Sequence, residues 1–100
     1  MSFSLGQTLA TYAINEAMSR QPFQAFIQNS IRRHHSKDWG DCCKEDKKVN
    51  GESLKMDMRL LSVYNIPTEL KSSNHQNNES IWIITEADRS STTILYPSEY

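Results

Sequence analysis

A short segment after residue 33 is dense in side chains that bind metals or transfer protons. They lie within ten consecutive positions: His34, His35, Asp38, Asp41, Cys42 and Cys43. Imidazole, carboxylate and thiolate groups are the ligands that zinc takes in proteins. Their spacing matches none of the usual zinc patterns, in which pairs of cysteines or histidines are separated by a few residues. We therefore expect these residues to be structural and expect no bound metal and no cofactor.

A second charged group, Glu86, Asp88 and Arg89, follows an apolar segment. Two carboxylates beside an arginine can hold a metal or transfer protons if Asp38 or Asp41 lies opposite them. The same residues are also typical of a turn in which the arginine joins two segments. The sequence shows no phosphate-binding glycine loop and no G-x-S-x-G motif, so we favour a non-enzymatic function.

Trp39 and Gly40 separate the two aspartates of the first group. Glycine reaches backbone conformations that other residues avoid, which predicts a tight turn at Gly40. Trp39 has two interpretations: a plug buried between helices and strands, or an exposed anchor for a protein partner. We favour the plug, because tryptophan is usually largely buried.

Basic residues are grouped although the formal net charge is only −1. Residues 20–37 contain Arg20, Arg32, Arg33 and Lys37 and no acidic residue. Arg32, Arg33 and Lys37 either contact nucleic-acid phosphates or neutralise the acidic segment that follows them. So few cations form a small electrostatic footprint, and nucleic-acid binding is therefore not our first hypothesis.

The elements that position these residues are helices followed by strands. Apolar residues recur at helical spacing over about 7–19 and 22–33, and a weaker helical pattern covers about 43–56. Strand-forming residues follow, at 59–64, 81–85 and 92–96. This order predicts an α+β fold in which two to three N-terminal helices pack on a three-stranded antiparallel β-meander.

Residues 1–100 are expected to form a single domain, because the chain is too short for a second core. The Asn- and Ser-rich residues 71–80 predict a flexible loop insertion. No apolar run approaches the length of a membrane span, and we find no secretory signal. Adjacent cysteines do not form a relaxed disulfide, so we expect a reduced, cytoplasmic protein without a membrane contact.

Two blocks of the sequence resemble a known family. The first is 34–41, His-His-Ser-Lys-Asp-Trp-Gly-Asp, and the second runs from Arg59–Tyr64 to Ile81–Ser90 and beyond. They resemble small bacterial proteins carried on plasmids and other mobile elements, described as plasmid-related or hypothetical. The resemblance covers about residues 22–100 and implies a bacterial, cytoplasmic protein associated with mobile elements. It carries over no catalytic residue.

Our functional hypothesis is a non-catalytic interaction module that presents two loops to a protein partner. The residues expected there are His34, His35, Asp38, Trp39, Asp41, Glu86, Asp88 and Arg89. One alternative is a small metal-assisted hydrolase or nuclease that uses the histidines and aspartates of this set. Another is a DNA-binding accessory factor that uses Arg32, Arg33 and Lys37. The weakly charged first helix also offers a surface for a homodimer.

Overall fold

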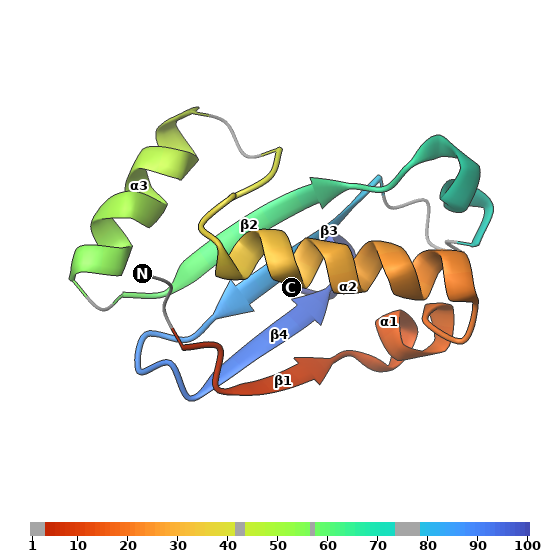
Figure 1. The fold of residues 1–100 in the computed structure, drawn as a ribbon, viewed down its shortest axis with the longest axis horizontal. Coiled ribbons are helices and arrows are strands. Elements are labelled where there is room, and N and C mark those ends of the chain that lie inside the picture. The colour runs from red at the N-terminus through yellow and green to blue at the C-terminus, as the bar shows by residue number, and fades with distance from the viewer. Residues whose placement is uncertain (1–3, 42–43, 57, 74–78) are drawn as a thin grey trace.

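A four-stranded mixed sheet with the strand order β1-β4-β3-β2 forms the centre of the molecule (Figure 1). This computed structural model describes residues 4–41, 44–56, 58–73 and 79–100. Three neighbouring strands pair antiparallel, and the first strand pairs parallel to β4. Their bounds are β1 Gln7–Ala10, β2 Leu60–Asn65, β3 Ser80–Thr85 and β4 Ser91–Leu95.

Two helices, α1 (Tyr12–Ala17) and α2 (Gln21–His35), lie on one face of this sheet, whereas α3 (Lys44–Lys55) lies beside β2 (Figure 1). Two short 3-10 helices, η1 (Thr68–Ser73) and η2 (Pro97–Glu99), follow β2 and β4. None of the helices in the described ranges is long and apolar enough to cross a bilayer. The molecule is thus a two-layer structure with one helix at its side.

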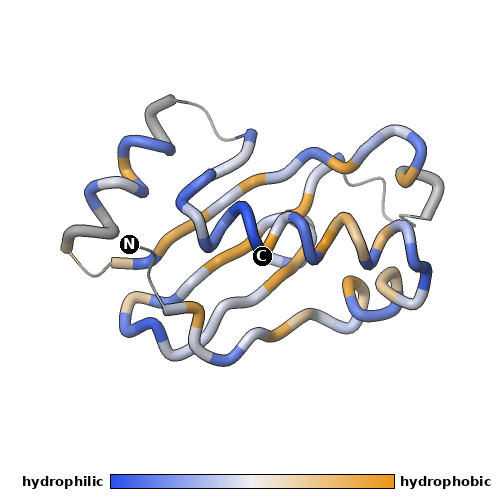
Figure 2. Tube along the Cα trace, viewed as in Figure 1, coloured by the Kyte–Doolittle hydropathy of each residue, from blue (hydrophilic) through white to orange (hydrophobic). Residues whose placement is uncertain are grey.

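The core lies between α2 and the sheet. The buried residues of α2 are Phe23, Ile27, Ser30 and His34, which recur at helical spacing and form one stripe. Opposite them, alternate strand residues point inward, among them Tyr64, Ile81, Ile83 and Ile94, and Figure 2 shows apolar (orange) stretches along the strands beneath α2. Burying a side chain such as Phe23 or Ile27 stabilises the fold by about 1.5–3 kcal/mol, so this stripe anchors the helix.

The expected α+β class is confirmed, but the expected three-stranded antiparallel meander is wrong in one respect. The sheet has a fourth strand, β1, which pairs parallel to β4. Residues 7–10 form this strand, although their apolar spacing predicted the start of a helix. Gly6, with a φ of +63°, lies against the backbone of Arg89 and Ser90 and directs the chain along β4. Pairing with a distant strand therefore overrides the local helical pattern.

The other expected elements are present, with changes at their ends. The second predicted helix extends to Gln21–His35, and the third is α3, which packs at the side of the sheet and not on its face. Part of the predicted 71–80 loop belongs to η1, and residues 74–78 lie outside the described part of the chain. Cys42 and Cys43 also lie outside it.

Candidate functional site

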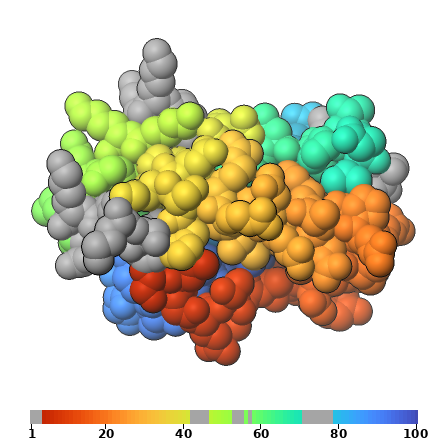
Figure 3. Space-filling view, in the orientation of Figure 1, coloured from red at the N-terminus to blue at the C-terminus, as the bar shows by residue number. Residues whose placement is uncertain are grey.

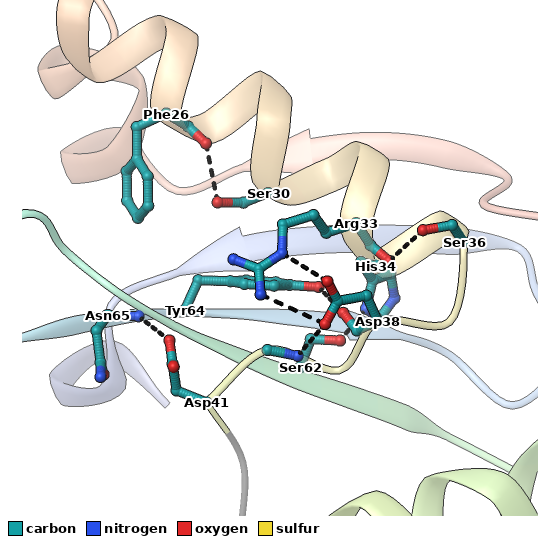
Figure 4. Close-up of polar contacts among 11 residues, drawn as sticks. Phe26, Ser30, Arg33, His34, Ser36, Asp38, Asp41, Ser62, Tyr64 and Asn65 are labelled. Carbon is teal, nitrogen blue, oxygen red and sulfur yellow. Dashed lines mark hydrogen bonds and ion pairs between the residues drawn. The ribbon is translucent and has the colours of Figure 1, made fainter.

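The turn after α2 is held by backbone and side-chain bonds to Arg33. Lys37 adopts a φ of 70°, and the amides of Lys37 and Asp38 donate to the carbonyls of His34 and Arg33. These two bonds form a Schellman motif, which satisfies carbonyl groups at a helix end. The Arg33 guanidinium donates two bonds to the Asp38 carboxylate, from Nε at 2.8 Å and from Nη2 at 3.3 Å (Figure 4). Arg33 also lies over the ring of Tyr64, 4.8 Å from its centroid.

The next residues, Trp39, Gly40 and Asp41, attach to the edge of β2 that does not pair with β3. The Trp39 carbonyl accepts a bond from the Val63 amide at 3.2 Å, and the Asp41 amide donates to the Val63 carbonyl at 2.6 Å. Gly40 forms a parallel bridge with Val63 at a φ of +78°, a backbone conformation that glycine adopts readily. An Asp41 carboxylate oxygen accepts from the Asn65 amide at 2.8 Å (Figure 4). Asp41 therefore bonds to the backbone at the end of β2.

α3 closes the remaining part of the β2 edge. The amide side chain of Asn50, which is 4% exposed, accepts from the Leu61 amide at 3.1 Å and donates to the Leu61 carbonyl. Leu61, Val63 and Asn65 thus all bond to groups outside the sheet. An edge strand blocked in this way cannot pair with another chain. Within the fold, the loop after α2 therefore serves to seal a sheet edge.

Replacing Asn50 by alanine is expected to lower the free energy of unfolding by about 2 kcal/mol. The change leaves the Leu61 amide and carbonyl without their two side-chain bonds, each worth about 1 kcal/mol. Urea denaturation measures the loss. Lys48 is exposed on the same helix, so Lys48→Ala is the matched control and should change stability by less than about 0.5 kcal/mol. Equal effects of the two changes would contradict the sealing role of Asn50.

A chain of buried hydroxyl groups crosses the sheet beneath the end of α2. His34 is fully buried, and its Nδ1 bonds to Ser62 while its Nε2 lies 2.9 Å from the Thr85 hydroxyl. The Thr85 and Thr92 hydroxyls are 2.8 Å apart, and Thr92 donates to the Leu5 carbonyl at 2.7 Å. One chain of bonds therefore connects α2, β2, β3 and β4 with the segment before β1.

The hydrogen bond from Thr92 to the Leu5 carbonyl determines which group donates in each of the other hydrogen bonds. A carbonyl only accepts, so the Thr92 hydroxyl uses its proton on Leu5, and Thr85 must donate to Thr92. Thr85 then accepts from the Nε2–H of His34, and Nδ1 accepts from the Ser62 hydroxyl. Nε2 of His34 therefore carries a proton, and the neutral ring accepts from Ser62 through Nδ1.

Burial, reinforced by the charge of neighbouring His35, lowers the pKa of His34 from 6.5 to about 4. The ring also contacts Trp39 edge to face, with the centroids 5.7 Å apart. Trp39 is 7% exposed, which confirms the plug interpretation. The pair of His34 and Ser62 has the residue types of a nucleophile and its base, but both are fully buried and a substrate cannot reach them.

The second predicted loop is an internally bonded turn. The Arg89 guanidinium donates to the carbonyls of Met58, Glu86 and Ala87, at 2.7, 3.0 and 3.3 Å. Asp88 accepts from the Ser90 amide at 3.0 Å, and its bonds with Ser90 lower the pKa of the carboxyl. This arrangement joins the β3–β4 turn to the segment before β2. It agrees with the turn interpretation of these residues.

The described residues do not assemble the acidic cleft that the enzymatic alternative requires. Asp38 pairs with Arg33, and Glu86 pairs with Arg59 at 3.6 Å. Within the described ranges, no three His, Cys, Asp or Glu side chains come together as metal ligands. The bond to Arg33 lowers the pKa of Asp38. His35, at the end of α2, is partly buried.

The predicted basic group is also divided. Arg33 is engaged by Asp38 and Tyr64, whereas Arg32 and Lys37 are exposed. Two exposed cations form a smaller phosphate-binding surface than the three that the nucleic-acid alternative requires.

Sequence reasoning missed the face of the sheet opposite α1 and α2, which we call the outer face. The residues that point there alternate with the core residues. The central ones are Leu9, Leu61, Val63, Trp82, Ile84, Thr93 and Leu95, and the polar residues at the strand ends are Gln7, Asn65, Ser80 and Ser91. Trp82 is partly exposed and contacts Tyr100 edge to face at 5.4 Å, while Tyr100 is 69% exposed. The C-terminal residue thus lies against the middle of this face.

The signal for this surface was present in the sequence as strand alternation. Trp82 lies between Ile81 and Ile83, so a strand that buries both isoleucines on one face must direct the tryptophan to the other. The alternation does not show how many helical layers pack on the sheet, because a second layer would have covered the same residues. Comparisons with protein-family models, curated proteins and solved structures gave no match.

Proposed function

We propose that this protein is a non-catalytic interaction module that binds a partner protein through the outer face of its sheet. The contact residues are Leu9, Leu61, Trp82, Thr93 and Tyr100. The resemblance to plasmid-related proteins supports a role in bacterial mobile-element biology. The proposal differs from our sequence hypothesis in the surface it uses, because the two loops are occupied by bonds within the fold.

The observation that carries the proposal is the Trp82–Tyr100 pair on an apolar sheet face. Aromatic side chains that remain partly exposed are typical of the energetic centres of protein interfaces. Leu9, 41% exposed, adds an apolar side chain on β1, whereas Ile84 and Leu95 on the same face are buried. Exposed apolar and aromatic residues that gather on one face of a small protein mark a binding site more often than scattered single residues do.

The charges around this face favour a neutral contact surface. Arg59 and Glu86 pair with each other at one end, and Arg59 donates to the Tyr100 hydroxyl at 2.8 Å. The strand residues that point to this face carry no charge: their side chains are aliphatic, aromatic, hydroxyl-bearing or, at Gln7 and Asn65, amides. A partner that presents an apolar surface with few charges fits this face, and burying a charge against it would be costly.

A lysine at Thr93 tests the proposal. Thr93 is partly exposed on the outer face, so Thr93→Lys places a charge in the interface without removing core packing. Exposed Gln24→Lys makes a matched charge change on the helical side. A photoreactive amino acid at position 82, with position 24 as the control, first cross-links and so identifies the partner in cells that carry the gene.

With the purified partner, Thr93→Lys is expected to weaken binding by roughly tenfold or more, and Gln24→Lys by less than about twofold. Isothermal titration calorimetry measures both, and circular dichroism verifies that the variants are folded. Unchanged affinity of Thr93→Lys, or equal cross-linking from positions 82 and 24, would contradict the assignment of the surface.

A further inference from the structure

The two edge strands of the sheet differ in how their outward backbone groups are covered. The β2 edge is sealed by Asn50, Trp39 and Asp41. All four residues of β1, at the other edge, are exposed, and in Figure 3 this red segment lies at the lower margin of the molecule. β1 also carries no charged residue and no proline, the usual features that prevent an edge from pairing.

The pairing of β1 with β4 determines which backbone groups remain outside. Gln7 and Thr11 donate their amides to the Ser90 and Ile94 carbonyls, at 3.0 and 3.1 Å. Because alternate residues of a strand direct their backbone groups to opposite sides, those of Thr8 and Ala10 face away from β4. No partner for these outward groups is seen among the described residues.

We propose that β1 pairs antiparallel with β1 of a second copy of this chain, which gives a dimer with one continuous sheet. Thr8 of each copy then lies opposite Ala10 of the other, and each such pair exchanges two backbone bonds. The outward groups are symmetric about Leu9, so the strand is complementary to itself. The two Leu9 residues meet on the two-fold axis as a non-hydrogen-bonded pair.

Other features of the edge support a second copy as the occupant. A neutral strand does not repel its own copy, and a C2 contact needs the same surface on both subunits. Leu9 is 41% exposed and gains a leucine neighbour in the dimer. The homodimer surface expected from the sequence was the face of a helix over 7–19, and in the structure residues 7–10 of that segment form this strand instead. The inference does not depend on the proposed partner protein.

Disulfide trapping tests the register. Antiparallel non-hydrogen-bonded pairs have Cα atoms about 4.5 Å apart, within the range of a disulfide. With Cys42 and Cys43 replaced by serine, Leu9→Cys should give a covalent dimer on mild oxidation. Thr8→Cys is the matched control, because its two copies are offset along the strands beyond disulfide range. Equal cross-linking at positions 8 and 9 would overturn the proposed pairing.

Sedimentation equilibrium of the intact chain tests the dimer itself. A short strand pair predicts a weak, concentration-dependent dimer. Thr8→Pro removes an outward amide from each copy without removing a bond to β4, and should weaken association by roughly thirtyfold. Thr8→Ala keeps the amide and should leave association within about twofold.

A wild-type chain that stays monomeric at every concentration overturns the proposal, including the case in which β1 binds a peptide of another protein. Dimerisation of Thr8→Pro as tight as that of the wild type also overturns it. If Thr8→Pro fails to fold, as judged by circular dichroism, the comparison of Leu9→Cys with Thr8→Cys decides. The Thr93→Lys experiment measures binding of the partner protein to the outer face. Its failure would therefore contradict the proposed function and leave the β1 dimer unaffected.

Discussion

Replacing Gly40 by alanine is expected to lower the free energy of unfolding by about 3 kcal/mol or more. Gly40 has a φ of +78°, which costs a residue with a side chain of order 1 kcal/mol. An alanine Cβ would also overlap the Val63 carbonyl and lie 2.6 Å from Cδ1 of Tyr64. The segment must therefore move away from β2, and the Val63 bonds to Trp39 and Asp41, each worth about 1 kcal/mol, are lost.

Gly51→Ala is the matched control for this change. Gly51 lies within α3, and nothing approaches within 4 Å of the position that a Cβ would take. Alanine is the better helix former by about 1 kcal/mol, so this variant should be more stable than the wild type. Urea denaturation of the three proteins measures the differences. If the two variants change stability in the same direction, the close approach of Gly40 to β2 is not what holds the loop.

The second large effect is a loss of stability in mild acid that originates at His34. The folded protein has a His34 pKa of about 4, against 6.5 for an unperturbed histidine. Between these two pH values the unfolded chain binds a proton that the folded chain does not, so stability falls as the pH falls. The free energy of unfolding should be fully retained above about pH 6.5 and decrease by about 3 kcal/mol by pH 4.

The structure explains why protonation is so unfavourable. A charged His34 carries a proton on both nitrogens, so Ser62 can no longer donate to Nδ1 and must redirect its hydroxyl in a buried site. Asp38 acts at lower pH, since its lowered pKa means that its stabilising contribution is lost as the pH falls below the ordinary value of 3.8. The two effects are therefore separated on the pH axis.

NMR titration of the His34 ring and urea denaturation from pH 8 to pH 4 measure this prediction. In His34→Gln, the amide retains a donor and an acceptor, and the loss of stability between pH 6.5 and 4 should largely disappear. The ring titration of the wild type provides the result if that variant does not fold. A His34 ring that titrates near pH 6.5 in the folded protein would contradict the buried neutral tautomer.

Part of the candidate site was accessible from the sequence. The stripe of Phe23 and Ile27 reaches His34 after two further helical turns, so the same periodicity that predicts the helix also directs this histidine to the core. The burial of Trp39 followed from the usual burial of tryptophan. By contrast, the partners of His34 come from distant strands, and Thr85 is 51 residues away in the chain. The sequence does not distinguish the Thr85 hydroxyl from that of any other strand residue, because only the strand register places it beside His34.

The amino-acid sequence alone determined α2, the strands β2, β3 and β4, and the face that each directs inward. These features depend on a segment's own apolar period, which is visible without knowledge of its neighbours. The tertiary structure decided that residues 7–10 form β1, that the β2 edge is sealed and that Trp82 stays partly exposed. Each of these features depends on which distant segment packs beside a strand edge or a sheet face. A local hydrophobic pattern contains no information about that packing.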